Sequence, residues 1–217
     1  APLANPALLT KAGPEDDFSL LLPSVGGQLS DPGNISDNAD KISDDWKAFD
    51  RAIDSQSNVS QTAARLKTRL QDFRHTHADA QVGTSAVATL PGDTLAAALM
   101  LKSYGTISVD GKVSDADLNY LESIANSNGQ DVDKDRLTSQ AFARAALVTD
   151  VGIALATELE TAGQKWSLGF TPKFQRVDLF NYNVLVKNYD SSAFKGDRYH
   201  NTRNGINADI GASMDLD

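Results

Sequence analysis

The chain has 217 residues, of which 41% are hydrophobic and 23% charged, and its formal net charge is −9. This composition indicates a folded protein with a sizeable core rather than a disordered chain. The chain contains no cysteine, which excludes disulfides, thiolate metal sites and thiol catalysis. Because phosphate binding requires clustered Lys and Arg, and no basic run is present, the acidic balance argues against a nucleic-acid partner.

Membrane and targeting segments of the usual helical kind are not visible. No stretch has the roughly 18–20 consecutive apolar residues of a membrane helix. The first residues, Ala1–Leu3, lack the charged and apolar regions of a signal peptide. The strand-like pattern of Ile210–Leu216 continues almost to the last residue. We therefore expect the chain to be part of a longer protein.

The first predicted elements are a strand followed by two helices. Asp17–Leu29 is short, apolar and bounded by glycine, which predicts a strand, and Asp31–Asp37 predicts a turn-rich connection. The apolar residues then change to helical spacing and predict two amphipathic helices, roughly Asp44–Ser55 and Ser60–Arg74. We expect these helices to form a hairpin that packs on its own apolar seam rather than a cofactor or partner site.

From residue 80 onward the hydrophobic period is two. Ala80–Leu90 and Thr94–Val109 flank a Pro-Gly-Asp turn and predict a β-hairpin. Ser114, followed three residues later by Asp117, resembles a capping box and predicts a short helix at about 114–126.

The last part of the chain alternates most clearly. Ala141–Leu159 predicts the longest strand, and Trp166–Val186, which begins WSLGFTPKFQ, predicts the next. The phase of the alternation slips near Arg176–Leu179, which predicts a bulge or bend. After a predicted polar loop at Lys187–Arg203, a final strand runs over Ile206–Leu216.

This alternation fits two environments. In a soluble sandwich the apolar face points into the protein core, whereas in a membrane barrel it points outward to lipid. The barrel is favoured because several strands reach the ~9–11 residues needed to cross a bilayer. Small, weakly polar residues on the other face and aromatic residues near the strand ends favour it too. The sandwich remains the alternative.

The predicted fold is mainly β: an antiparallel up-and-down barrel of the transmembrane type, present only in part. About six or seven strands are visible, whereas single-chain barrels start at eight. We expect residues 1–217 to form a single barrel-like domain with a helical insert at about 44–74 and a short helix at about 114–126.

Four segments resemble a known family. They are similar to segments of the TraF-type conjugal transfer proteins of plasmid-like transfer operons. The segments are ANPALL at Ala4–Leu9, TDVGIALATEL at Thr149–Leu159, WSLGFTPKFQRVDLFNYNV at Trp166–Val184 and ADIGASMDLD at Ala208–Asp217. Members of that family are predicted outer-membrane barrels, distantly similar to FadL-type fatty-acid channels. The lack of cysteine separates the chain from the thioredoxin-like periplasmic protein that shares the TraF name. Neither the leader nor the aromatic-ended closing strand that this pattern leads us to expect is visible in residues 1–217.

The resemblance implies a protein of the outer membrane of a Gram-negative bacterium, with the lipid bilayer as its partner. Its role would be a passive channel for small polar or apolar solutes, or a scaffold for other envelope proteins. A soluble β-rich binding or interaction module is the alternative. No Ser-His-Asp order, phosphate-binding glycine loop or metal-binding helix motif is present, so we predict no enzyme activity and no cofactor.

Candidate lumen-facing residues are Asp150, Glu158, Lys173 and Asp209, which the alternation puts on polar faces. In a barrel they would line the lumen and influence what passes; in a soluble protein they would be ordinary solvated residues. Both readings stay open.

Two other groups suggest metal sites and are better explained otherwise. Asp131, Asp133 and Asp135 resemble a calcium loop, but the Gly and Glu that an EF-hand requires are replaced by Arg136 and Phe142. We expect a solvated acidic loop. His75 and His77 lack a third ligand, and we expect surface histidines at a helix end.

Overall fold

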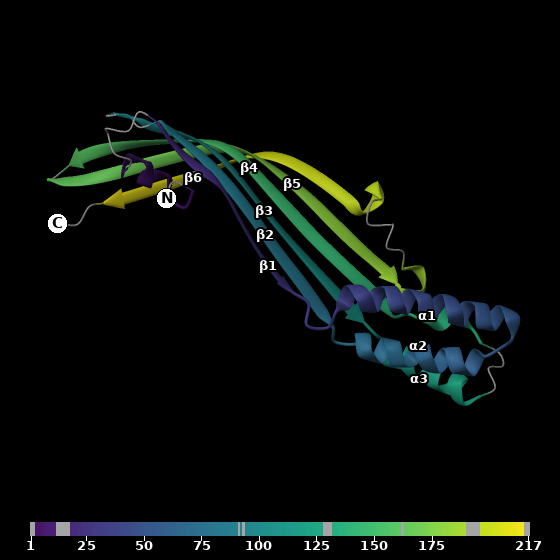
Figure 1. Ribbon diagram of the computed structural model, residues 1–217. Helices are drawn as coiled ribbons and strands as arrows, with labels where there is room; N and C mark the ends of the chain where they lie inside the picture. The colour runs from purple at the N-terminus through teal and green to yellow at the C-terminus, as the bar shows by residue number, and fades with distance from the viewer. Residues whose placement is uncertain are drawn as a thin grey trace.

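A long, open antiparallel sheet forms most of the molecule, with helices at one end of it (Figure 1). The computed structural model describes residues 3–11, 18–90, 92, 94–127, 132–161, 163–189 and 196–214. The predicted turn residues Pro91 and Asp93 and the acidic Asp131 lie outside these ranges, as do the last two residues of the predicted final strand. No helix in the described ranges is long and apolar enough to cross a membrane.

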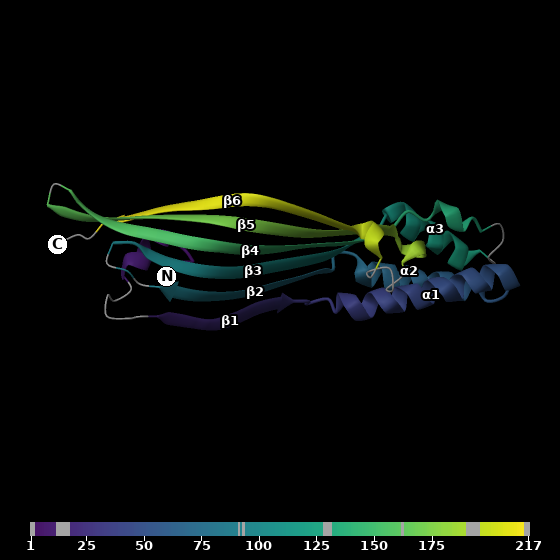
Figure 2. The ribbon, with the colours of Figure 1, turned by 90° about the horizontal axis from the view of Figure 1, so that it is seen from above.

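The sheet has six strands, and each strand is antiparallel to the one before it in the chain. This order confirms the predicted mainly-β, up-and-down arrangement. In order, the strands are β1 (Ser19–Ser30), β2 (His77–Leu90), β3 (Ala96–Lys112), β4 (Gln140–Thr161), β5 (Gln164–Leu185) and β6 (His200–Met214). Among the described residues β1 and β6 are opposite edges that do not pair with each other, so the sheet is not closed into a barrel (Figure 2).

The helices lie between consecutive strands. α1 (Ile35–Ser55) and α2 (Val59–Phe73) connect β1 to β2, and α3 (Asp115–Asn126) connects β3 to β4. Figures 1 and 2 show all three at the same end of the sheet, whereas the N-terminal segment lies near the other end. Short 3₁₀ turns complete the fold: η1 (Pro6–Lys11), η2 (Lys134–Arg136), η3 (Val186–Asn188) and η5 (Asp197–Tyr199).

The three helices and the turns η2 and η3, which we call the helical module, have a conventional hydrophobic core. The helical spacing of apolar residues directs one stripe of each helix inward, and Phe49, Leu66 and Leu121 are fully buried there. Phe73 packs so closely on β3 that a side chain at Gly111 would overlap its ring. The module therefore packs on itself, as predicted, and also on the end of the sheet.

The first helix begins earlier than the sequence pattern predicts. Ile35 and Ile42 are buried in the module core, and the backbone N–H of Ile35 donates to the Asp31 carboxylate at 2.7 Å. The prediction of a turn through Asp37 was therefore wrong, because an aspartate upstream of the helix satisfies one of its free N–H groups.

The predicted capping box at Ser114 is also wrong. Ser114 precedes α3 in an extended conformation, but its side chain makes no capping hydrogen bond. The Asp117 carboxylate turns away from the helix start and accepts from the backbone N–H groups of Thr138 (2.8 Å) and Ser139 (2.6 Å). Asp117 thereby ties α3 to the residues that lead into β4.

The predicted bulge near Arg176 does not exist. β5 keeps one continuous register with β4 and β6 through residues 176–179. The hydrophobic phase slips because Arg176 and Asp178 form an ion pair at 2.9 Å on the otherwise apolar side of the strand. The irregularity in the sheet lies instead in β1, between Leu21 and Ser24, next to Pro23. β6 also begins at His200, inside the predicted polar loop.

The two faces of the sheet differ sharply. We call the face that carries Phe170 and Ile210 the apolar face and the face that carries Lys173 and Asp209 the polar face. Phe170 is 46% exposed and Ile210 85% exposed. A sandwich would bury these side chains beneath a second layer, and no such layer exists in the described part of the chain. The sandwich alternative is therefore wrong for these residues.

Candidate functional site

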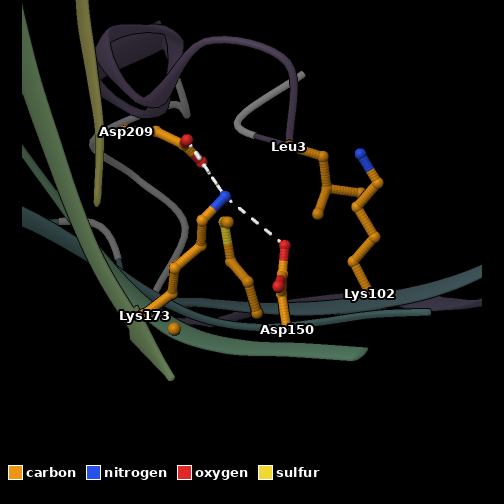
Figure 3. Close-up of a pocket in the computed structure, with 7 residues that line it drawn as sticks. Leu3, Lys102, Asp150, Lys173 and Asp209 are labelled. Carbon is orange, nitrogen blue, oxygen red and sulfur yellow. Dashed lines mark hydrogen bonds and ion pairs between the residues drawn. The ribbon is translucent and has the colours of Figure 1, made fainter. Parts of the chain in front are cut away.

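Three of the four predicted polar residues meet at one point of the polar face (Figure 3). Lys173 on β5 extends between Asp209 on β6 and Asp150 on β4. Its ammonium donates to both Asp209 oxygens, at 3.0 and 2.9 Å, and lies 3.4 Å from Asp150. The three residues come from three adjacent strands, and alternation alone puts their side chains on the same face.

The ion cluster is only partly accessible to water. The side chains of Lys173 and Asp150 are 13% and 16% exposed, respectively, whereas that of Asp209 is 46% exposed. Gln175 also donates to Asp150, at 2.8 Å. Charges that lose water in this way are retained when they are paired and hydrogen-bonded. The cluster holds two carboxylates and one ammonium, and Lys102 of β3, the register partner of Asp150, lies on the same side of the sheet. This region of the polar face is therefore a hydrogen-bonded lining that carries charges of both signs.

A small cavity of about 30 Å³ lies beside the cluster. Leu3 from the N-terminal segment and Lys102 from β3 form its other side (Figure 3). This volume accommodates one or two water molecules and is too small for an organic ligand. The cluster therefore has the character of a polar wall rather than of a substrate pocket.

The fourth predicted residue lies apart from the cluster. Glu158 is also on the polar face, nearer the end of β4, and its carboxylate is 3.9 Å from the Lys11 ammonium at the end of η1. Both side chains are substantially exposed, so this ion pair contributes little to stability.

The N-terminal segment, Leu3–Lys11, lies directly on the polar face next to the cluster. Gly169 and Gly211 are register partners there, and a Cβ on either one would overlap this segment. Asn5 holds the segment by donating from its side-chain amide to the Ala212 carbonyl at 3.1 Å. Gly169 permits the close approach of the Pro6–Ala7 backbone, and Gly211 leaves room for the side chains of Asn5 and Pro6.

The segment also covers a patch of small residues. Leu9 is buried in a cluster made by β2, β3 and β4. Its neighbours are Val87, Ala96, Ala98, Met100, Ala154 and Ala156. Because alanine side chains are short, the segment can lie close to the sheet while Leu9 still loses its contact with water.

Several residues of this site were not identified from the sequence. Gln175 and Lys102 lie within predicted strands, but neither was singled out as a site residue. Gly169 and Gly211 gave a usable signal, because isolated glycines within strands often indicate a close backbone approach. What approaches them depends on the fold, since Leu3–Lys11 is far from both strands in the sequence.

The other candidate groups have structural explanations in the described residues. Asp135 forms an ion pair with Lys187 at 2.7 Å, and this hydrogen bond lowers the pKa of the Asp135 carboxyl. Asp133 accepts from the Asp135 backbone N–H. His77 lies between Asp110 and Asp79, at 2.7 and 3.1 Å. His75 is exposed just after α2. In the described ranges, no group of three or more His, Asp or Glu side chains is arranged so that it could hold a metal ion.

Comparison with known proteins identifies the family. No curated protein and no solved structure matches the chain. A family model does match, over residues 2–217, and it describes the F plasmid transfer operon protein TraF. The match covers the N-terminal segment, the helical module and all six strands. The chain therefore belongs to the F plasmid transfer operon TraF family, which associates it with conjugal transfer.

Proposed function

We propose that the chain forms part of the wall of an outer-membrane β-barrel of a Gram-negative bacterium, which serves conjugal transfer as a passive channel or as a scaffold for envelope proteins. In this proposal the apolar face contacts lipid and the polar face lines the lumen, where Asp150, Glu158, Lys173 and Asp209 influence which solutes pass. The protein carries out no catalysis. A distant relationship to FadL-type fatty-acid channels belongs to the same proposal.

The exposed apolar face is the observation that carries this proposal. Large aliphatic and aromatic side chains are exposed along all six strands of one face. Examples from successive strands are Leu20, Val82, Leu99, Ile153, Phe174 and Ile206. A water-soluble surface rarely exposes a continuous apolar patch of this extent, whereas lipid hydrocarbon is a favourable solvent for it. Unpaired strand edges are unfavourable within a bilayer, so the proposal requires further strands beside β1 and β6.

A matched pair of substitutions on β3 tests which solvent this face contacts. Leu101 is 45% exposed on the apolar face, and Tyr104 is 43% exposed on the polar face. An arginine that faces lipid costs ~2–4 kcal/mol near the bilayer centre and little near a water-filled lumen. We expect Leu101→Arg to reduce the amount of full-length protein assembled in outer membranes, and Tyr104→Arg to leave it near the wild-type level.

Membrane fractionation provides the direct check. The full-length protein should sediment with outer membranes and require detergent for extraction. Release with the periplasmic contents, together with equal behaviour of the two arginine variants, would reject the barrel. A soluble β-rich interaction module, with a protein partner over its apolar face, would then replace it.

Solute flux separates a channel from a scaffold. The full-length protein reconstituted in vesicles should pass small solutes, and Asp209→Asn should shift the preference away from cations, because charged side chains that line a pore select ions by sign. Tight vesicles that contain correctly inserted protein would favour the scaffold.

A further inference from the structure

The apolar residues on the apolar face form a band with clear limits on β5 and β6. On β5 the band runs from Trp166 to Phe174 and stops at the charged Arg176. On β6 it runs from Met214 to Ile206 and stops at Asn204. Because Phe174 and Ile206 are register partners, as are Arg176 and Asn204, the limit falls at the same level on both strands.

On the other strands the band extends farther toward the helical module. Residues that pair from strand to strand form a row across the sheet. One such row contains Val82 of β2, Gly105 of β3, Leu147 of β4 and Asp178 of β5. Val82 and Leu147 are exposed apolar side chains at a level where β5 already carries a charge. The next row contains exposed Leu29 and Ile107. The limit near the helices therefore shifts by about six residues between β6 and β1.

The opposite limit of the band shifts in the same direction. Leu90, the last residue of β2, is in the same row as Phe170 and Ile210, through Ala97 and Leu155. On β4 and β5 the band continues about four residues beyond that row, to Leu159 and Trp166. The band thus crosses the sheet obliquely, with two nearly parallel limits.

The slope and the width of the band have the dimensions of a bilayer crossing. At ~3.3 Å per residue and ~4.8 Å per strand step, a shift of about six residues over the five steps from β6 to β1 corresponds to an angle of ~40°. The shift of about four residues over the three steps from β2 to β5 gives nearly the same angle. Strands in barrels tilt by about 35–45°. About nine residues per strand at this tilt cover ~23 Å, close to the ~25 Å apolar band of outer-membrane barrels.

We infer that this oblique band is the part of the sheet in contact with lipid hydrocarbon. The strands cross the bilayer at this tilt, and Arg176, Asp178 and Asn204 lie at the headgroup level on the side of the helical module. The inference rests on the proposed barrel, and it adds which residues of each strand lie within the bilayer. The strands are much longer than one crossing, so the helical module and the adjoining ends of the strands project into water.

An aromatic cluster beyond Arg176 supports this level for the membrane surface. Phe180 and Tyr182 on β5 contact Tyr199 of η5, with ring centroids 6.2 and 4.8 Å apart, and His200 lies 5.0 Å from Phe180. Tyrosine and tryptophan are enriched where membrane proteins cross from hydrocarbon to water. Trp166 holds the corresponding place at the other limit of the band on β5.

Single-cysteine labelling can measure the tilt, since the chain has no cysteine of its own. Nitroxide labels are placed on Val82→Cys and Asn204→Cys in the full-length protein reconstituted in phospholipid vesicles. The Asn204 row lies nearer the middle of the band than the Val82 row. Untilted strands would therefore put the label at 204 deeper, whereas the oblique band puts the label at 82 deeper.

A second pair measures the other limit, and a label on the polar face serves as control. Leu90→Cys and Ile210→Cys lie in one row, and we expect only position 210 to be deep. Depth is measured from collisions with oxygen, which enters hydrocarbon, and with a water-soluble nickel chelate. Tyr104→Cys should collide with nickel under either placement of the strands.

The outcomes separate the inference from the proposed function. Deeper labels at 82 than at 204, and at 210 than at 90, support the oblique band. If the labels contact lipid but the label at 204 is deeper than that at 82, and the labels at 90 and 210 are equally deep, the tilt is wrong and the barrel is retained. Nickel collisions at all four positions on the apolar face would overturn both.

Discussion

In the helical module, Phe49, Leu66 and Leu121 are fully buried, whereas Ile206 and Ile210 on the apolar face of the sheet are almost fully exposed. Both regions follow a regular hydrophobic period: helical in the module, and two in the sheet. The module encloses its apolar stripes with protein, because three helices can surround one core. An open single-layer sheet encloses nothing, and its apolar face depends on whatever surrounds the molecule. Hydrophobic periodicity thus indicates which side is apolar, without indicating which solvent that side meets.

The largest difference between the two regions should appear when a leucine is shortened. Leu66→Ala leaves a cavity in the module core and should lower the free energy of unfolding by about 2–5 kcal/mol. Leu101→Ala on the apolar face should cost clearly less, because surrounding solvent or lipid fills the space and no cavity remains. Chemical unfolding followed through Trp46, in a Trp166→Phe background, measures the first change, and Trp166 fluorescence in a Trp46→Phe background measures the second. Equal costs would mean that protein covers the apolar face.

The connection between the regions gives the next largest effect. The buried Asp117 carboxylate accepts hydrogen bonds from Thr138 and Ser139, which lead into β4. Asp117→Ala leaves their backbone N–H groups without a partner and should destabilise the module by about 1–3 kcal/mol. Amide exchange at Thr138 and Ser139 should increase.

A surface ion pair of the module serves as the control for Asp117. Glu122 pairs with Lys67 at 2.9 Å, and the Glu122 side chain is largely exposed. Glu122→Ala should cost less than about 1 kcal/mol. If both variants lose the same stability, Asp117 is not the connection that the hydrogen bonds indicate.

The smallest and most local effect concerns the N-terminal segment. A methyl group on Gly211 would overlap Asn5 and Pro6, so Gly211→Ala should displace Leu3–Lys11 from the polar face. Gly205→Ala on the same strand and face provides the control, because nothing lies within 4 Å of a Cβ there. Amide exchange at Ala7, whose N–H donates to the Asn5 side chain, should increase only in the first variant. Global stability should change by about 1 kcal/mol or less in either. Protection of Ala7 in both variants would contradict the docked position.

Much of the secondary structure follows from local patterns. Alternation predicted the strands that became β2 to β6, and the sheet order agrees with consecutive hairpins. The errors occurred where a polar side chain had a tertiary partner. Asp117 accepts hydrogen bonds from Thr138 and Ser139, just before β4, instead of capping α3. Arg176 pairs with Asp178 on the apolar face without interrupting the register of the strand. Asp31–Asp37 was predicted to be a turn-rich connection and the first helix to begin at about Asp44, although the helix begins at Ile35, which is buried in the module core.

The candidate site was only partly predictable. Alternation correctly grouped Asp150, Lys173 and Asp209 on polar faces, since successive side chains in a strand point to opposite sides. Their meeting depends on the register between β4, β5 and β6, which the sequence pattern leaves open by steps of two residues. Glu158 shares the face and still lies apart from the cluster for the same reason.

The sequence by itself determined which residues are strands, which are helices and which side of each strand is apolar, because these properties arise from repeats of two and 3.6 residues along the chain. The tertiary structure decided which strands are neighbours and in which register they pair. It thereby decided that an N-terminal segment rests on Gly169 and Gly211, that Lys173 joins two aspartates, and that the apolar residues form an oblique band. These features arise from contacts between residues far apart in the chain, and no local period encodes them.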